Sequence, residues 1–123
     1  NIVTEAFTAA MNTSSAPFPP EINEFEKAGL AVEASRLVKP PRVQGIAAAL
    51  ECKVTDIRPL AGLNGHAGRY TMVLGEVIGV HVDEAILKGG RVDAQHFRLL
   101  ARLGYMDYAV VERVFELQRP LAG

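Results

Sequence analysis

The sequence predicts a mainly β fold with short helices, most simply a small barrel. Residues 47–57 alternate between apolar and polar side chains, residues 71–84 form a long β-branched stretch, and residues 105–119 alternate again. Short helical patterns and turns rich in glycine or proline separate these stretches. The chain has 123 residues, which suits a single domain over 1–123.

The N-terminal quarter of the chain has helical patterns around a loop. Residues 4–12 predict a short helix with Thr4 as its N-cap. Residues 12–23 contain three prolines and several small polar side chains, which indicate a loop. Residues 21–30 predict one or two helical turns that end at Gly29.

Two central strands are predicted to pair. In the first, 47–57, the side chains of Ala48, Leu50, Cys52 and Val54 share the apolar face. The second covers 71–84, and a turn-rich connection over 58–69 favours an antiparallel arrangement. Glu51 and Glu76 lie on these two strands, where we expect them to have hydrogen-bond partners.

Two glycines interrupt the second of these strands. Gly75 and Gly79 are expected on the same face as Val73 and Val77. A glycine inside a strand marks a bulge, a barrel corner or the close approach of another group. We therefore expect the strand to bend and another layer to pack closely over it.

The C-terminal third is predicted to contain two short helices and a strand. The first helix lies over 83–88 and is closed by Gly89 and Gly90. The second carries Phe97, Leu100 and Ala101 on one side and ends at Gly104. The final strand, over 105–119, stops at Pro120.

Composition excludes several classes of function. The net charge of −1 predicts that the chain binds neither nucleic acid nor an anionic membrane surface. No apolar run reaches the roughly 20 residues of a membrane span. The single cysteine excludes an intrachain disulfide, so we expect a cytoplasmic protein.

The chain starts without Met, and its first residues resemble the end of a strand, so we expect it to be part of a longer protein.

The residue types that often carry catalysis lack the spacing that catalysis needs. We predict no metal site, because the histidines lack helical zinc-motif spacing; they are His66, His81 and His96. Ser14 and Ser15 have no G-x-S-x-G nucleophile elbow around them. Cys52 is predicted to be a buried, inert thiol. No glycine loop with phosphate-binding spacing opens a helix.

Several motifs, in order and spacing, resemble a known family. They are "AMNTSSAPFPPEINEFEKAGL", "KPPRV…ALECKVTDI", "VLGEVIGVHVDE", "LKGGRVD" and "ARLGYMDYAVVERVFELQRP". Together they resemble the C-terminal portion of flavin reductase-like, FMN-binding split-barrel proteins, in the branch of flavoredoxin and the reductase components of two-component monooxygenases. The resemblance covers essentially the whole chain.

This resemblance implies a six-stranded split barrel, present here without its N-terminal strands. It also implies a homodimer that binds FMN near its interface and reduces flavin with NAD(P)H for a partner oxygenase or another electron acceptor. The stretch that holds the FMN phosphate would lie before Asn1. Two histidines of some family members are replaced here by Tyr70 and Ala101, which weakens the case for nicotinamide chemistry.

On this interpretation we expect two segments to lie nearest the flavin, the loop 12–16 and the turn 102–108. In the first, Asn12, Ser14 and Ser15 are candidates to donate hydrogen bonds to ring carbonyls or ribityl hydroxyls. In the second, Tyr105 and Tyr108 are candidates to stack on the ring or bond its edge. Arg102 is a candidate to neutralise charge on reduced flavin or on a nicotinamide phosphate, with pairing to Asp107 as the structural alternative. These six are the cofactor-binding candidates, and no catalytic residue is assigned.

Two other functions remain open at this point. One is a non-enzymatic FMN-binding electron carrier on the same fold, which would hold flavin with the same residues. The other is a β-barrel interaction domain without a ligand. Reduction of added flavin and the colour of the purified protein separate the three.

Overall fold

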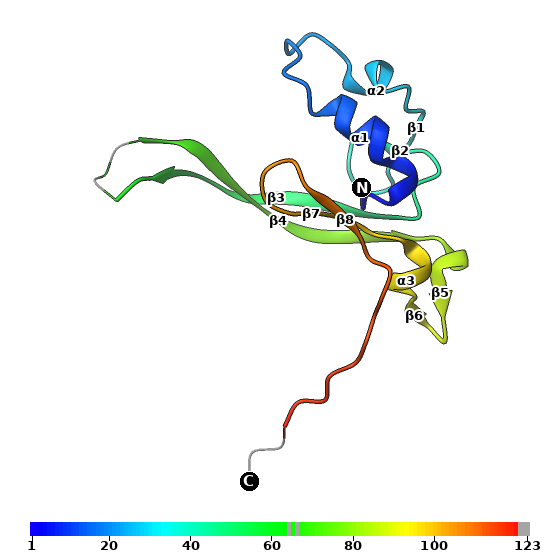
Figure 1. Cartoon of the computed structure of the whole chain (residues 1–123). Coiled ribbons are helices and arrows are strands. Elements are labelled where there is room, and N and C mark those ends of the chain that lie inside the picture. Colours follow the sequence, from blue (N-terminus) through cyan, green and yellow to red (C-terminus); the bar gives the residue numbers. More distant parts are fainter. Residues whose placement is uncertain (64, 66, 121–123) are drawn as a thin grey trace.

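The fold consists of small antiparallel sheets and short helices around one long two-stranded ribbon (Figure 1). The computed structural model describes residues 1–63, 65 and 67–120. The helices are η1 (Glu5–Phe7), α1 (Thr8–Ser14), α2 (Glu24–Lys27), η2 (Glu84–Ile86) and α3 (Ala94–Phe97), where η marks a 3-10 helix. The strands are β1 (Val32–Glu33), β2 (Arg42–Val43), β3 (Ala48–Ala61), β4 (Ala67–Val82), β5 (Leu87–Lys88), β6 (Arg91–Val92), β7 (Leu100–Arg102) and β8 (Tyr108–Val110). The pairs among them are β1–β2, β3–β4, β5–β6 and β7–β8. The predicted class, mainly β with short helices, is confirmed.

The ribbon β3–β4 confirms the predicted antiparallel pair. Its register runs from Ala48 opposite Val82 to Ala61 opposite Ala67. Both strands are longer than predicted, because the backbone of 58–61 and 67–70 stays extended and paired. The predicted connection over 58–69 is therefore wrong in length, and only residues 62–66 separate the two strands. The ribbon reaches far beyond the other elements on one side (Figure 1).

The buried face of β3 is the opposite of the predicted one. Ala49 and Glu51 are buried, whereas Leu50 and Cys52 are exposed. The prediction of a buried Cys52 thiol is wrong. Alternation holds over 49–52, but Val43, Ile46 and the loop before β2 cover the face that carries Ala49 and Glu51. In the paired strand, Ile78 forms a bulge, because Glu51 pairs with Gly79 and Cys52 with Val77.

The two glycines of β4 contact different neighbours. A Cβ atom on Gly79 would lie 3.0 Å from Leu37 Cδ1, so the missing side chain lets the loop before β2 approach the ribbon. A Cβ on Gly75 would lie 3.3 Å from the Cβ of Cys52 on the paired strand. Close approach, one of the expected roles, is thus confirmed for Gly79.

Two small cores flank the start of the ribbon. The first contains Val43, Ile46 and Ala49, with Phe7, Phe25 and Leu30 packed against it. It joins α1 and α2 to the ribbon. The second contains Ala48, Ile86 and Phe97, with Ile2, Ala47 and Leu99 against it. It joins α3 and η2 to the same end of the ribbon.

The N-terminal elements follow the prediction with one extension. Thr4 precedes η1 in an extended conformation, but its side chain makes no capping hydrogen bond. Helix α1 continues to Ser14, so the predicted loop starts later than residue 12. Asn23 caps α2 by accepting from the Phe25 amide, and Gly29 after it has φ +64°.

The C-terminal elements differ more from the prediction. Gly89 and Gly90, both with positive φ, form the turn between β5 and β6 rather than the end of a helix. The predicted helix through residue 104 is wrong, because Arg98 adopts φ +47° and ends α3, and the chain continues as β7.

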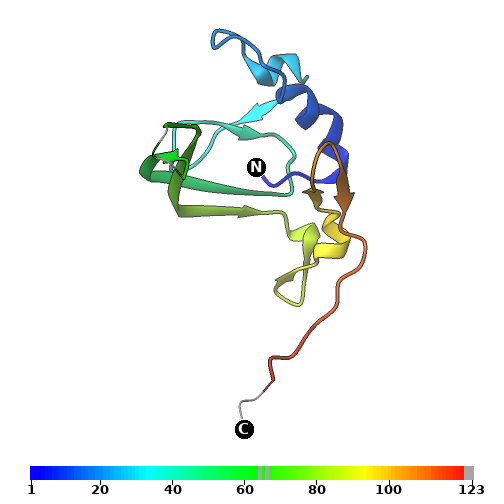
Figure 2. The ribbon, with the colours of Figure 1, turned by 60° about the vertical axis from the view of Figure 1, so that its left-hand side comes forward.

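The predicted strand over 105–119 is confirmed only at Tyr108–Val110. After Val111, whose amide donates to Leu99 O, the chain runs away from the body as an arm without an assigned strand partner among the described residues (Figure 2). A strand pattern alone does not supply the neighbouring edge that a strand needs.

No helix in the described part of the chain has the length and apolar character needed to cross a membrane.

Candidate functional site

The most concentrated polar contacts surround the carboxylate of Glu51 on β3. Glu51 Oε1 accepts from the Arg36 amide at 2.8 Å and also contacts His81 Nε2. Glu51 Oε2 accepts from the amides of Leu37 at 2.6 Å and Val38 at 3.1 Å. The residue is only 3% exposed, so three backbone amides and an imidazole replace the water that would otherwise hydrogen-bond to this carboxylate.

These donors stabilise the ionised form of Glu51. They hold its pKa down to about 2, with the Arg36 amide as the largest cause. Burial raises the pKa of Glu51, whereas the hydrogen bonds from His81 and the Leu37 amide lower it further. The expectation that Glu51 has hydrogen-bond partners is confirmed. Glu76 is exposed and lies opposite Lys53 in the ladder.

We expect the stability that Glu51 provides to vanish in acid. Its pKa is lower in the folded than in the unfolded state, so its contribution is complete above the ordinary carboxyl pKa of about 4.3 and is lost as the pH falls toward about 2. Urea unfolding of the natural full-length protein and its Glu51→Gln variant, between pH 6 and 2.5, measures this. The difference between their midpoints should shrink as the pH falls. A difference that stays constant over that range would contradict the assignment.

The first group of sequence-predicted residues lies at the end of α1. Ser14 Oγ donates to Met11 O at 2.8 Å and Ser15 Oγ donates to Asn12 O at 2.7 Å. Both hydroxyl donors are therefore used within the helix, although their oxygens can still accept. Asn12 is exposed, and its side-chain amide makes no hydrogen bond within the described part of the chain.

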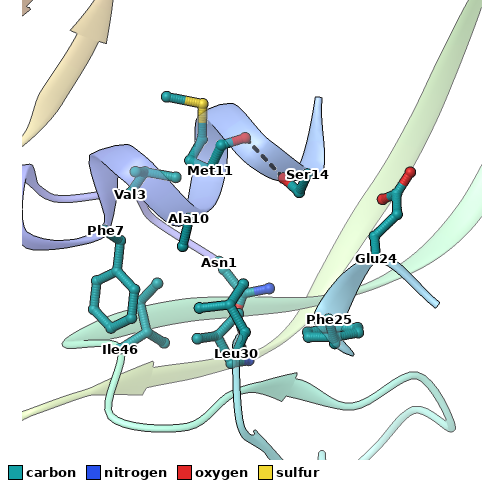
Figure 3. A pocket seen from close by; sticks show the side chains of 11 residues that line it. Asn1, Val3, Phe7, Ala10, Met11, Ser14, Glu24, Phe25, Leu30 and Ile46 are labelled. Atoms are coloured by element: carbon teal, nitrogen blue, oxygen red, sulfur yellow. Dashed lines mark hydrogen bonds between the residues drawn. The ribbon is translucent and has the colours of Figure 1, made fainter. Parts of the chain in front are cut away.

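Ser14 also borders a hollow beneath α1 (Figure 3). This hollow has a volume of about 200 Å³ and lies between α1, α2 and the loop before β3. Its lining is mainly apolar: Val3, Phe7, Ala10, Met11, Phe25, Leu30, Val43 and Ile46, with Asn1, Ser14 and Glu24 as the polar members. Phe7 and Ala10 point into it toward Leu30 and Ile46, whereas the side chain of Met11 points the other way (Figure 3).

The second group of predicted residues lies on the hairpin β7–β8. Arg102 Nη1 donates to the Tyr108 hydroxyl at 3.1 Å, and Nη2 donates to Tyr105 O at 3.3 Å. The guanidinium carbon also lies 5.6 Å from the centre of the Tyr108 ring. Arg102 thus stabilises its own hairpin rather than pairing with Asp107. Both hydrogen bonds use guanidinium donors that an external anion would need.

Tyr105 occupies the tip of this hairpin in an unusual conformation. Its φ is +58°, a value that few residues other than glycine and asparagine adopt. Its side chain is 96% exposed, next to the exposed Met106. An aromatic ring in this position is free to stack on a flat ligand.

The two predicted groups have no direct polar contact with each other. Among the described residues, no hydrogen bond or ion pair joins Asn12, Ser14 or Ser15 to Arg102, Tyr105 or Tyr108. The cluster around Glu51 was not predicted from the sequence, because the backbone amides that donate to its carboxylate lie 13 to 15 residues earlier in the chain. The only hint was a glutamate on a half-buried strand.

No group of three or more histidine, cysteine or acidic side chains is placed to hold a metal ion in residues 1–63, 65 and 67–120. His81 faces Glu51, and Asp83 caps η2 by accepting from the Ala85 amide. His66 lies outside the described residues.

Comparison with known proteins identifies the family. Residues 1–107 match the model of the flavin reductase like domain. The chain belongs to this family. A relative from Halalkalibacterium halodurans, an uncharacterised protein, is 32% identical over 120 residues. That alignment covers 98% of this chain but 57% of the relative, so this flavin reductase-like chain spans little more than half of that protein's length.

Solved structures confirm the split-barrel class. Nitrilotriacetate monooxygenase component B from Bacillus cereus superposes with a TM-score of 0.85 at 30% identity. The match covers 94% of this chain and 57% of that one. A Shewanella frigidimarina protein with a split barrel domain gives a TM-score of 0.80 at 22% identity, covering 98% and 59% of the two chains, and shows the fold alone. The resemblance stated from the motifs is confirmed.

Proposed function

We propose that the protein containing this chain is an FMN-binding flavin reductase that uses NAD(P)H and supplies reduced flavin or electrons to a partner. The observation that carries this proposal is the likeness to a monooxygenase component B over 94% of the chain at 30% identity. The proposed partner is an oxygenase or another electron acceptor. Because the reaction draws on NAD(P)H, we expect it in the cytoplasm.

The residues of this chain fit a flat, polar-edged cofactor. The exposed ring of Tyr105 has the geometry for stacking, and Arg102 and Tyr108 hold the hairpin that presents it. The exposed amide of Asn12 and the oxygens of Ser14 and Ser15 suit carbonyl and hydroxyl groups. When bound, FMN accepts hydride and passes electrons on, and the protein's task is to orient it and exclude competing reactions.

An assay of the natural full-length protein would test the proposed reductase activity. A flavin reductase should oxidise NADH or NADPH when free FMN is added, and it should purify with flavin absorbance. A yellow protein without that oxidation would favour the electron carrier, which Tyr70 and Ala101 in place of two family histidines also favour. A colourless protein that binds no added FMN would contradict both and favour an interaction domain.

A homodimer is part of this proposal. The ribbon exposes many large apolar side chains in this chain: Leu50, Val54, Ile57, Leu60, Met72, Val73, Leu74, Val77 and Val80. These side chains lie on both faces of the ribbon and need cover, which we expect from the remainder of the protein and from a second copy. An obligate dimer should bury on the order of 2,000 Å² or more. Sedimentation that shows only monomer at micromolar concentration would remove this part of the proposal.

Replacing Tyr105 with alanine should weaken flavin binding. Loss of a stacked ring costs roughly 1.4 kcal/mol, which corresponds to about a tenfold rise in Kd. Fluorescence titration of FMN against the full-length protein measures this. Met106→Ala is the matched control, since Met106 is the next residue and 89% exposed, and it should change Kd less than about twofold. An unchanged Kd in folded Tyr105→Ala would exclude the stacking role.

A further inference from the structure

The loop between β1 and β2 depends on one side chain for most of its backbone hydrogen bonds. This loop, residues 34–41, forms the tip of the hairpin in which Val32 pairs with Val43 and Glu33 with Arg42. Its last two residues, Pro40 and Pro41, have no amide hydrogen to donate. The amides of three consecutive residues, 36 to 38, all donate to the carboxylate of Glu51.

The other contacts of this tip are weaker or internal. Ser35 Oγ donates to Pro40 O at 2.6 Å, which closes the loop on itself but does not attach it to the ribbon. Leu37 rests over Gly79, yet its side chain remains exposed. Glu51 therefore provides the main polar attachment of the tip to the ribbon among the described residues.

Consecutive backbone amides that converge on one point form a binding site for an anion. Here the anion is the protein's own carboxylate, delivered by β3 and contacted from the other side by His81 on β4. Burial of Glu51 keeps water from competing for the same donors. Since a carboxylate accepts charge-assisted hydrogen bonds from all three amides, it holds the tip more firmly than a neutral acceptor would.

The attached tip shapes the surface on both sides of the ribbon's start. Arg36 and Leu37 border one hollow together with Gly79 and His81. On the other side, Ser35, Val38, Pro40 and Pro41 border a second hollow with residues 49–52. If the tip were released, both hollows would lose a wall and Arg36 would leave its place beside His81.

We propose that Glu51 is a positioning residue that latches the 34–41 tip onto the β3–β4 ribbon and so fixes the tip residues that line the two hollows. His81 orients the carboxylate. This inference does not depend on the proposed flavin chemistry, because it follows from contacts between this chain's own residues. Its functional consequence is that a change at Glu51, which itself lines both hollows, also displaces the tip residues that wall them.

Hydrogen–deuterium exchange of the natural full-length protein tests the latch. In Glu51→Gln, whose side chain keeps one acceptor oxygen, at least one of the amides of residues 36–38 should exchange about tenfold faster or more, a factor that corresponds to about 1.4 kcal/mol. The ladder amides of β3 and β4 should keep their protection. Glu76→Gln, the same change at an exposed site on the ribbon, should leave the tip unchanged.

A second variant keeps the test decisive if Glu51→Gln fails to fold. His81→Gln leaves the carboxylate and its amide donors in place, so the tip should remain protected but exchange faster than in the wild type. Wild-type protection at residues 36–38 in a folded Glu51→Gln protein would overturn the proposal. So would exchange of these amides at unstructured rates in the wild type.

Discussion

Replacing Phe97 with alanine should lower the free energy of unfolding of the full-length protein by about 3–5 kcal/mol, the usual cost of removing a buried aromatic side chain. Phe97 is 6% exposed and packs with Ala48 and Ile86. It is the largest side chain of this small core, so no neighbour can fill the cavity that it would leave. Urea unfolding followed by circular dichroism gives the value.

Phe115→Ala is the matched control for this substitution. It makes the same chemical change in the C-terminal arm, where the ring is 68% exposed. The loss there should stay within about 0.5 kcal/mol. A loss below about 1 kcal/mol for Phe97→Ala would contradict the packing of α3 against the ribbon. A large loss for Phe115→Ala would instead show that the arm is covered in the intact protein.

Phe97 also connects the core to the candidate site. Helix α3 ends at Arg98, and β7 starts two residues later and carries Arg102. The hairpin with Tyr105 and Tyr108 is thus attached to the body through the segment that Phe97 anchors. We expect Phe97→Ala to loosen this hairpin as well as to destabilise the fold.

The elements that could be predicted from the sequence are those that a local pattern encodes. The ribbon was found because strand patterns persist through 47–57 and 71–84, and α2 was found because a helical pattern over 21–30 ends at Gly29. Helix α3 was extended too far since a single left-handed residue, Arg98, ends it. Nothing about an arginine predicts φ +47°.

Features that depend on distant partners could not be predicted. The buried face of β3 was assigned wrongly because the residues that cover Ala49 and Glu51 come from earlier in the chain. The contacts of Arg102 depend on how the hairpin turns at Tyr105, and those of Glu51 on where the 34–41 tip folds back. In each case the contact partners come from another segment of the chain, so composition and periodicity do not predict the contact.

The distribution of cations bears on where flavin phosphate would bind. Arg42 on β2 and Arg91 on β6 are candidates, but Arg42 Nη1 lies 2.8 Å from Glu33 Oε1, and Arg91 Nη1 lies 3.6 Å from Glu116 Oε1. The side chain of Arg69 lies outside the described part of the structure. From the family resemblance we expect the phosphate-holding stretch to lie before Asn1, and this chain covers 57% of its relative from Halalkalibacterium halodurans.

We therefore expect the polypeptide of residues 1–123 alone to bind FMN at least ~100-fold more weakly than the full-length protein, a loss of about 2.8 kcal/mol. Stacking and a few neutral hydrogen bonds would remain, whereas charge-assisted bonds to phosphate, which are roughly twice as strong, would be lost. Isothermal titration of both polypeptides with FMN measures the ratio, and circular dichroism establishes that the shorter one folds. Riboflavin, which lacks the phosphate, is the matched ligand control: its affinity should differ less between the two polypeptides than that of FMN. Equal FMN affinities with a folded shorter chain would place the phosphate site within residues 1–123, and Arg36, which has no ion pair in the described part of the chain, would then be the first residue to replace.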